Sequence, residues 1–168
     1  MLKILTVNPQ KYQDSILKLF EEYLRFNQKV IAECLNIHFD LNAILKQEPK
    51  KLSQFSPPTG FFLCVQDNLK MIGCAGLRSL TPQISEIKRV YLKPEYRRQG
   101  VGRLLLKTLL EKATKSGFKR VRLDCFQGLI AAKNLYKSLG FQDIQPYLES
   151  EIPREYHQHW LFLEKQLH

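Results

Sequence analysis

The chain has 168 residues, which is enough for one domain whose hydrophobic core needs neither disulfides nor metals. Its 44% hydrophobic content is typical of a globular protein, and no apolar run approaches the roughly 20 residues of a membrane span. The net charge of +10 indicates an anionic partner, although a solvated basic surface would give the same balance. We therefore expect a single domain over residues 1–168 that does not act in a membrane.

The N-terminus and the cysteines indicate the compartment. The chain begins with a strand-like run and no secretory signal is visible, so we expect a cytoplasmic protein. The four cysteines form no C-x-x-C pair, and three of them lie in apolar, strand-like runs. Buried free thiols are the prediction. A catalytic cysteine stays open, but no neighbouring His or Asp favours one.

The N-terminal third is predicted to hold one strand and two helices. Residues 2–7 alternate as a strand does, and apolar side chains then recur every three or four positions over 9–34. A shorter helix is expected at about 41–48, with Asp40 as its N-cap and Pro49 as a break after it.

The middle of the chain is predicted to be β-rich. Asp67 and Asn68 supply the turn of a hairpin between two apolar runs, and a third run follows a Thr-Pro pair. These strands are expected at 61–66, 69–77 and 84–92.

The C-terminal half alternates helices with strands. A helix over 101–115 ends at Gly117, and a shorter one over about 129–138 ends at Gly140. Further strands are expected at 121–126, 141–145 and 159–164. The order predicts a mixed α/β sheet of about seven strands, with two N-terminal helices and a central parallel βαβ unit.

The most informative stretch is Tyr-Arg-Arg-Gln-Gly-Val-Gly-Arg, residues 96–103, between a predicted strand and a predicted helix. Gly100 and Gly102 allow a tight turn and a close approach to a ligand, because neither has a Cβ. The helix start presents free amide N–H groups at the positive end of its dipole. Fixed positive charge is added by Arg97, Arg98 and Arg103. This combination predicts a pyrophosphate site at the carboxyl end of a sheet strand, where open α/β sheets bind ligands.

Two familiar phosphate motifs do not fit this stretch. The dinucleotide fingerprint needs a third glycine where the chain has Leu105, and the Gly-Lys-Ser/Thr of a P-loop is absent. The pattern Arg97-x-x-Gly100-x-Gly102 instead resembles the acetyl-CoA loop of the GNAT family of N-acetyltransferases.

Three further segments carry the same resemblance. Residues 86–96 are similar to the strand that runs into the acetyl-CoA loop, and Trp160–Glu164 is similar to the closing strand. Ala132-x-x-Leu135-Tyr136-x-x-x-Gly140-Phe141 resembles the late helix and the strand after it. The resemblance covers about 60–168, whereas the first 59 residues match only in helix content and a Pro-Pro-Thr-Gly loop. It implies the GNAT fold, also called the acyl-CoA N-acyltransferase fold.

The resemblance also implies a binding site for acetyl-CoA. The strand before the loop would splay from its neighbour and pair its backbone with the pantetheine amides, and an N–H there would stabilise the oxyanion. The pyrophosphate would lie on the N–H groups after it. The implied cofactor-binding residues are Val90, Tyr91, Leu92, Arg97, Arg98, Gln99, Gly100, Val101, Gly102 and Arg103. One departure is Leu129, at a position where relatives often carry an Asn that contacts the cofactor.

Two catalytic residues are implied in the same way. Tyr136 matches the family's general acid, which protonates the departing CoA thiolate; the alternative is a core tyrosine with a satisfied hydroxyl. Glu86 lies eleven residues before Arg97 and is the candidate base, directly or through water, if burial raises its pKa. The alternatives are a surface Glu paired with Lys88 or Arg89, and an amine that loses its proton to solvent.

The function implied is an acetyl-CoA-dependent N-acetyltransferase. It would act on a primary amine of a small, acidic or amino-acid-like acceptor by direct attack in a ternary complex. One alternative is an acyl-CoA-binding module without transfer. The other is a basic nucleic-acid-binding protein, but the sequence has no zinc or RNP-like pattern that supports it. No metal is expected, because His157 and His159 lack further ligands. A homodimer is left open.

Overall fold

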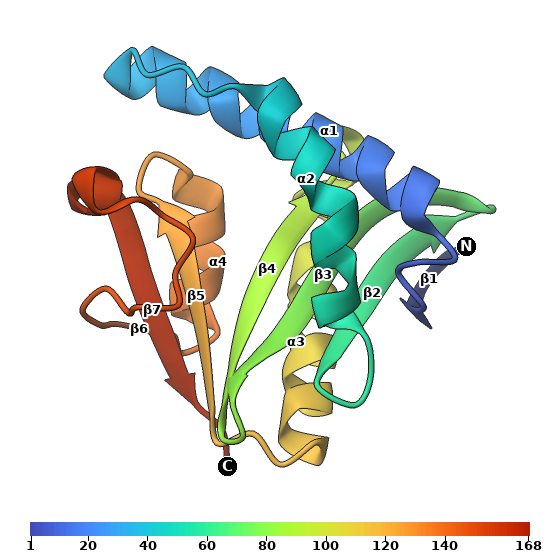
Figure 1. Ribbon diagram of the computed structural model, residues 1–168. Helices are drawn as coiled ribbons and strands as arrows, with labels where there is room; N and C mark the ends of the chain where they lie inside the picture. The colour runs from blue at the N-terminus through green and yellow to red at the C-terminus, as the bar shows by residue number, and fades with distance from the viewer.

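The computed structural model describes residues 1–168 and contains a seven-stranded sheet with helices on both faces (Figure 1). The strand order is β1-β2-β3-β4-β5-β7-β6, and neighbouring strands are antiparallel except for the parallel pair β4 and β5. The predicted mixed α/β sheet and its parallel unit are thereby confirmed. The strands are β1 (Leu2–Val7), β2 (Gly60–Asp67), β3 (Lys70–Thr81), β4 (Ile84–Leu92), β5 (Arg120–Phe126), β6 (Gln142–Asp143) and β7 (Trp160–Gln166).

Helices α1 and α2 cover one face of the sheet, and α3 and α4 lie behind it in the view of Figure 1. They are α1 (Gln13–Leu35), α2 (Leu41–Lys51), α3 (Val101–Lys115) and α4 (Ile130–Ser138). Short 3-10 helices are η1 (Leu52–Phe55), η2 (Pro94–Tyr96) and η3 (Arg154–His159). Asp40 caps α2 as predicted, because its Oδ1 accepts a hydrogen bond from the Ala43 N–H at 3.0 Å. None of the helices has both the length and the apolar character that crossing a bilayer requires.

The two faces of the sheet bury separate hydrophobic clusters. The larger cluster joins β2–β5 and β7 to α3 and includes Leu63, Leu105 and Leu123. The smaller cluster joins β1–β4 to α1 and η1 and includes Phe55 and Tyr91. Because side chains alternate along a strand, the residues of β4 and β5 that face away from α3 lie on the side of α1 and α2.

Strands β4 and β5 stay together over only three residue pairs, from Ile84↔Arg120 to Glu86↔Arg122, and then diverge (Figure 1). A β-bulge accompanies the divergence: β4 inserts one extra residue opposite β3, next to Arg89, whose φ is +59°. Bulges bend a strand and increase its twist. The carboxyl half of β4 therefore has no strand partner on the β5 side, as the resemblance implied.

Three predicted boundaries were wrong. Pro49 does not break α2, which continues to Lys51. Tertiary contacts outweigh the lost hydrogen bond, because Glu48 before the proline and Leu52 after it are both buried. Leu69 belongs to the hairpin turn, with φ +75°, rather than to the strand.

The strand predicted at 141–145 contains only Gln142 and Asp143. The Ile144 N–H still bonds to the Phe162 carbonyl at 2.9 Å, but Pro146 then offers no N–H to continue the ladder. The chain leaves the sheet and forms a segment, 144–159, that is irregular up to η3 and returns across the face carrying α1 and α2 (Figure 1).

Candidate active site

The start of α3 carries a row of free amides. Gly100 is the N-cap of α3 with φ +80°, and Arg98 before it has φ +59°. The six N–H groups from Arg98 to Arg103 donate to no group in the protein. A Cβ on Gly100 would meet nothing within 4 Å, so no protein atom crowds the turn at this glycine. Successive free N–H groups at a helix start form a site for an anion.

The three arginines of this turn have different surroundings. Arg98 is exposed, and Arg103 donates through Nη2 to the Ser138 Oγ of α4 at 2.6 Å. Arg97 donates through Nε to the Leu92 carbonyl at 2.8 Å, and its guanidinium lies 4.2 Å from the ring centroid of Phe26 on α1. These contacts fasten the turn to α1 and β4, and no carboxylate pairs with Arg97, so its positive charge stays beside the free amides.

The side chains of the other predicted residues of the turn are engaged within the protein or, at the glycine, absent. The Gln99 side chain donates to the Glu95 carbonyl at 2.9 Å, and Val101 is buried in the larger cluster. Gly102 has only the Leu135 side chain near its Cβ position, at 3.5 Å. These residues offer their backbone N–H groups to a ligand, rather than their side chains.

Of the three β4 residues expected to meet pantetheine, two face the gap. The Lys93 N–H bonds to Ile72 of β3, and Tyr91 is paired with Cys74 of β3. Because backbone groups alternate in direction along a strand, Val90 and Leu92 point theirs toward the missing β5 partner. The Leu92 carbonyl is already taken by Arg97. The backbone of Tyr91 is directed to β3, which corrects its expected role.

Tyr136 lies behind this gap on α4. It is 7% exposed, its ring packs edge-on against Phe141, and its hydroxyl makes no hydrogen bond in the protein. Burial raises the pKa of the phenol well above its usual value, and Cys125, Tyr23 and Asp124 nearby add to the shift. The hydroxyl is therefore protonated at neutral pH and can donate a proton but cannot serve as a base.

Glu86 is completely buried, so the alternative of a surface-facing glutamate is excluded. Its carboxylate accepts hydrogen bonds from the Tyr147 hydroxyl at 2.7 Å and from Arg78 Nε at 2.6 Å. Lys88 lies 3.8 Å away. Burial raises the pKa of Glu86, while Lys88 and Arg78 oppose the shift. Both oxygens are thus already engaged in the protein.

Sequence reasoning missed a second carboxylate, Asp124 of β5. Its Oδ2 lies 3.3 Å from Lys88 Nζ and accepts a hydrogen bond from Ser150 Oγ at 3.1 Å. The charge of Asp124 also contributes to raising the pKa of both Tyr23 and Tyr136, after the larger effect of burial. One signal was available: Asp124 is the only acidic residue of its strand and alternates with buried apolar ones.

The second missed feature is Glu151, in the irregular segment. Its Oε1 lies 3.4 Å from Lys51 and 3.8 Å from Arg78, and its Oε2 lies 3.6 Å from Lys88 and 3.4 Å from Arg89. Burial alone would raise the pKa of Glu151, but these four cations lower it to about 2. One carboxylate thus collects cations from α2, β3 and β4, which no local pattern could have predicted.

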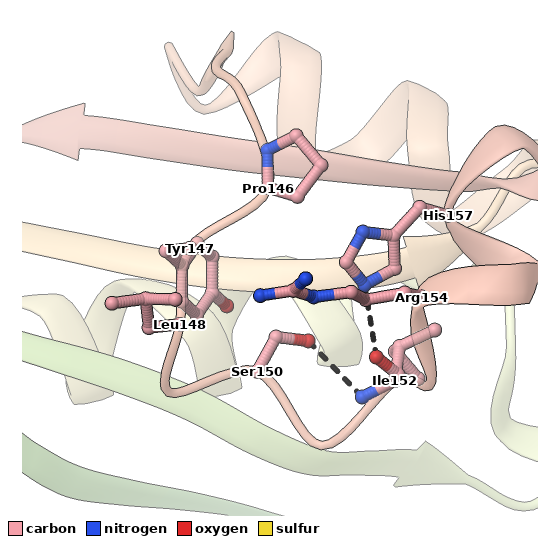
Figure 2. A pocket seen from close by; sticks show the side chains of 7 residues that line it. All are labelled: Pro146, Tyr147, Leu148, Ser150, Ile152, Arg154 and His157. Carbon is pink, nitrogen blue, oxygen red and sulfur yellow. Dashed lines mark hydrogen bonds between the residues drawn. The ribbon is translucent and has the colours of Figure 1, made fainter.

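The segment around Glu151 encloses a cavity of about 310 Å³ (Figure 2). Within the segment, Ser150 Oγ accepts from the Ile152 N–H at 3.2 Å, and His157 Nε2 lies 2.9 Å from the Ile152 carbonyl. The cavity is lined by Pro146, Tyr147, Leu148, Ser150, Ile152, Arg154 and His157. His157 is thus a pocket residue.

The lowered pKa of Glu151 makes acid stability testable. An unfolded glutamate titrates near pH 4.3, so the folded state gains stability above that pH and loses it as the pH falls toward about 2. The difference should not exceed about 3 kcal/mol. In urea unfolding between about pH 2 and 6, Glu151→Gln should flatten this dependence. Glu149→Gln, an exposed neighbour, should keep the wild-type slope; equal slopes in all three proteins would contradict the assignment.

Comparison with known proteins identifies the family of this fold and site. The Acetyltransferase (GNAT) family matches residues 16–141, three quarters of the chain, so the protein belongs to the GNAT family. The chain is 34% identical over 104 residues to an uncharacterised N-acetyltransferase of Schizosaccharomyces pombe, covering 61% of this chain and 64% of that protein. The match therefore spans slightly less than two thirds of that relative's length.

Two further similarities, one of sequence and one of fold, are to proteins with named activities. It is 40% identical over 58 residues to thialysine N-epsilon-acetyltransferase of Bos taurus, covering 34% of each chain. Its fold matches the structure of the PaiA N-acetyltransferase of Thermoplasma acidophilum in complex with coenzyme A. That match has a TM-score of 0.76, with 18% identity and 99% of each chain covered.

Proposed function

We propose that the protein transfers an acetyl group from acetyl-CoA to the amine of a small acidic acceptor. The observation that carries this proposal is the row of six free amides at the start of α3, beside the open edge of β4. The coenzyme A complex of the Thermoplasma protein and the N-acetyltransferase names of the relatives support it. The name of the Bos taurus relative supports an amine as the acceptor.

The donor would bind along the gap. Its pyrophosphate would take the amides of residues 98–103, with Arg98 and Arg103 adding charge from the surface, and each charge-assisted bond would contribute about 1.5–3 kcal/mol. The pantetheine arm would follow β4, where the N–H groups of Val90 and Leu92 face the gap. One of these N–H groups is also the proposed donor to the oxyanion.

The acceptor would enter from the face of α1 and α2. Its neutral amine nitrogen attacks the thioester carbonyl, the C–N bond forms, and the C–S bond breaks. Tyr136 gives its proton to the departing thiolate, and the proton of the amine passes to a carboxylate or to water. Glu86 is the base proposed from the sequence, and Asp124 is the rival in the structure because no hydrogen bond reaches its Oδ1.

The two carboxylates can be separated by substitution. If Glu86 takes the proton, Glu86→Gln should lower kcat by about 10²-fold and shift the acid limb of the pH–rate profile. If Asp124 takes the proton, Asp124→Asn should instead be the variant that lowers kcat and shifts the acid limb. Loss of kcat in one variant, with kcat retained in the other, assigns the base. Retention of kcat in both would show that the proton leaves to solvent.

The test of the proposed function is release of CoA thiol from acetyl-CoA in the presence of a panel of amines. The panel pairs each free amino acid with its carboxamide, so that the acceptors differ only in one carboxylate. We expect amine-dependent release with a preference for the acidic members. Binding of acetyl-CoA without transfer to any amine would indicate the acyl-CoA-binding module instead.

A further inference from the structure

Three of the four cations around Glu151 also pair with another carboxylate. Arg89 is held by Glu48 at 2.6 Å, Arg78 by Glu86 at 2.6 Å, and Lys88 by Asp124 at 3.3 Å. Three of the four cations therefore keep a carboxylate partner when Glu151 leaves, and the cluster of Lys51, Arg78, Lys88 and Arg89 would then lack one negative charge. We call this group the cation cluster.

Glu151 itself is held mainly by its side chain. It lies outside any helix or strand, and neither its N–H nor its carbonyl takes part in a backbone hydrogen bond. The side chain of Glu151 is 28% exposed, and that of Lys51 beside it is 38% exposed. A carboxylate of a small molecule could therefore reach the same cations from solvent and replace that of Glu151 without unfolding the sheet.

The position of the cation cluster suits an acceptor. Lys88 joins the cluster to Asp124, and the charge of Asp124 acts on the phenols of Tyr23 and Tyr136. A molecule with its carboxylate on the cluster could place an amine toward these groups, on the face opposite α3. The net basic charge of the chain would favour the approach of such an anion.

We propose that the cation cluster binds the carboxylate of the acceptor, and that Glu151 occupies this site until the acceptor displaces it. The identity of this anion as an acceptor rests on the proposed acetyl transfer, but the binding site itself does not. Glu151 is then a specificity-determining residue, because a neutral amine binds the cation cluster too weakly to displace its carboxylate.

The test is calorimetric binding of succinate, with neutral succinamide as the matched probe and no acetyl-CoA present. Succinate should bind Glu151→Gln at least about tenfold more tightly than the wild type. In the variant, the carboxylate of succinate no longer competes with that of Glu151 for the cation cluster. Glu149→Gln changes an exposed side chain of the same segment and keeps the backbone carbonyl that accepts from Arg78 Nη2 at 2.9 Å, so it should bind succinate as the wild type does. Succinamide should bind to none of the three proteins. Equal succinate affinity in all three proteins, or equal binding of succinamide, would overturn the proposal.

A second measurement uses the wild type and so does not depend on the variant folding. Saturating succinate should accelerate amide hydrogen exchange in the peptide covering 148–156, because displaced Glu151 releases the segment. Unchanged exchange would contradict displacement. Neither measurement involves transfer: succinate binding with no acetylation of any amine would refute the proposed function alone, and acetylation without succinate binding would refute only this site.

Discussion

Tyr136→Phe should lower kcat by about 10²-fold and leave the affinity for acetyl-CoA unchanged. The substitution removes one oxygen and keeps the ring against Phe141. Because the hydroxyl has no hydrogen-bond partner in the protein, its removal leaves no buried group unsatisfied and should not destabilise the fold. Loss of rate would then report loss of the proton that the thiolate receives.

The pH–rate profile gives a second check on Tyr136. Because burial raises the pKa of its phenol well above the usual value, the acid form should persist throughout the neutral and mildly alkaline range. We expect no alkaline limb from Tyr136 below about pH 10. Tyr12→Phe, at an exposed tyrosine before α1, is the control and should retain full activity. An equally active Tyr136→Phe enzyme would remove Tyr136 from the mechanism.

Gly100→Val should weaken acetyl-CoA binding by about tenfold to a hundredfold, the loss of one charge-assisted hydrogen bond. The side chain would fill open space at the turn that carries the free amides, and φ +80° is strained for a β-branched residue. Calorimetric titration of acetyl-CoA measures the effect, with thermal unfolding measured in parallel.

The chain offers a matched control for this substitution. Gly117, at the other end of α3, has φ +88° and also has nothing within 4 Å of its Cβ position. Gly117→Val should therefore destabilise the fold to a similar extent, while acetyl-CoA binding stays at the wild-type level. If both valines weakened binding equally, the effect would be one of folding, and the free amides would lose their assignment.

The parts of the molecule that the sequence predicts are those determined by local chemistry. Helix α3 was predicted from residue 101 to 115 because a glycine stands just outside each end, at 100 and 117, and both glycines have a positive φ in the structure. The pyrophosphate site was predictable for the same reason, since its amides belong to one continuous stretch of chain.

The parts that escaped prediction depend on contacts between distant residues. The side chain of Arg97 turns toward α1 because Phe26, some seventy residues earlier, supplies an aromatic face. Glu151 contacts cations at positions 51 to 89, and it lies in a segment whose sequence has no helical or strand periodicity. The prediction that Pro49 ends a helix failed because burial of its neighbours outweighs the propensity of one residue.

The three-pair contact between β4 and β5 places an open strand edge in the middle of a sheet. An open edge normally invites strand addition from another chain, and thereby aggregation. Here α1 packs on β4 on one face and α3 packs on the neighbouring β3 on the other (Figure 1), and an incoming strand must project side chains toward both faces. A pantetheine arm carries amides but has side groups only at its pantoate end, so it would need less room at this edge than a polypeptide strand. The helices on both faces beside this edge thus hinder strand addition, and with it polymerisation of the protein with itself.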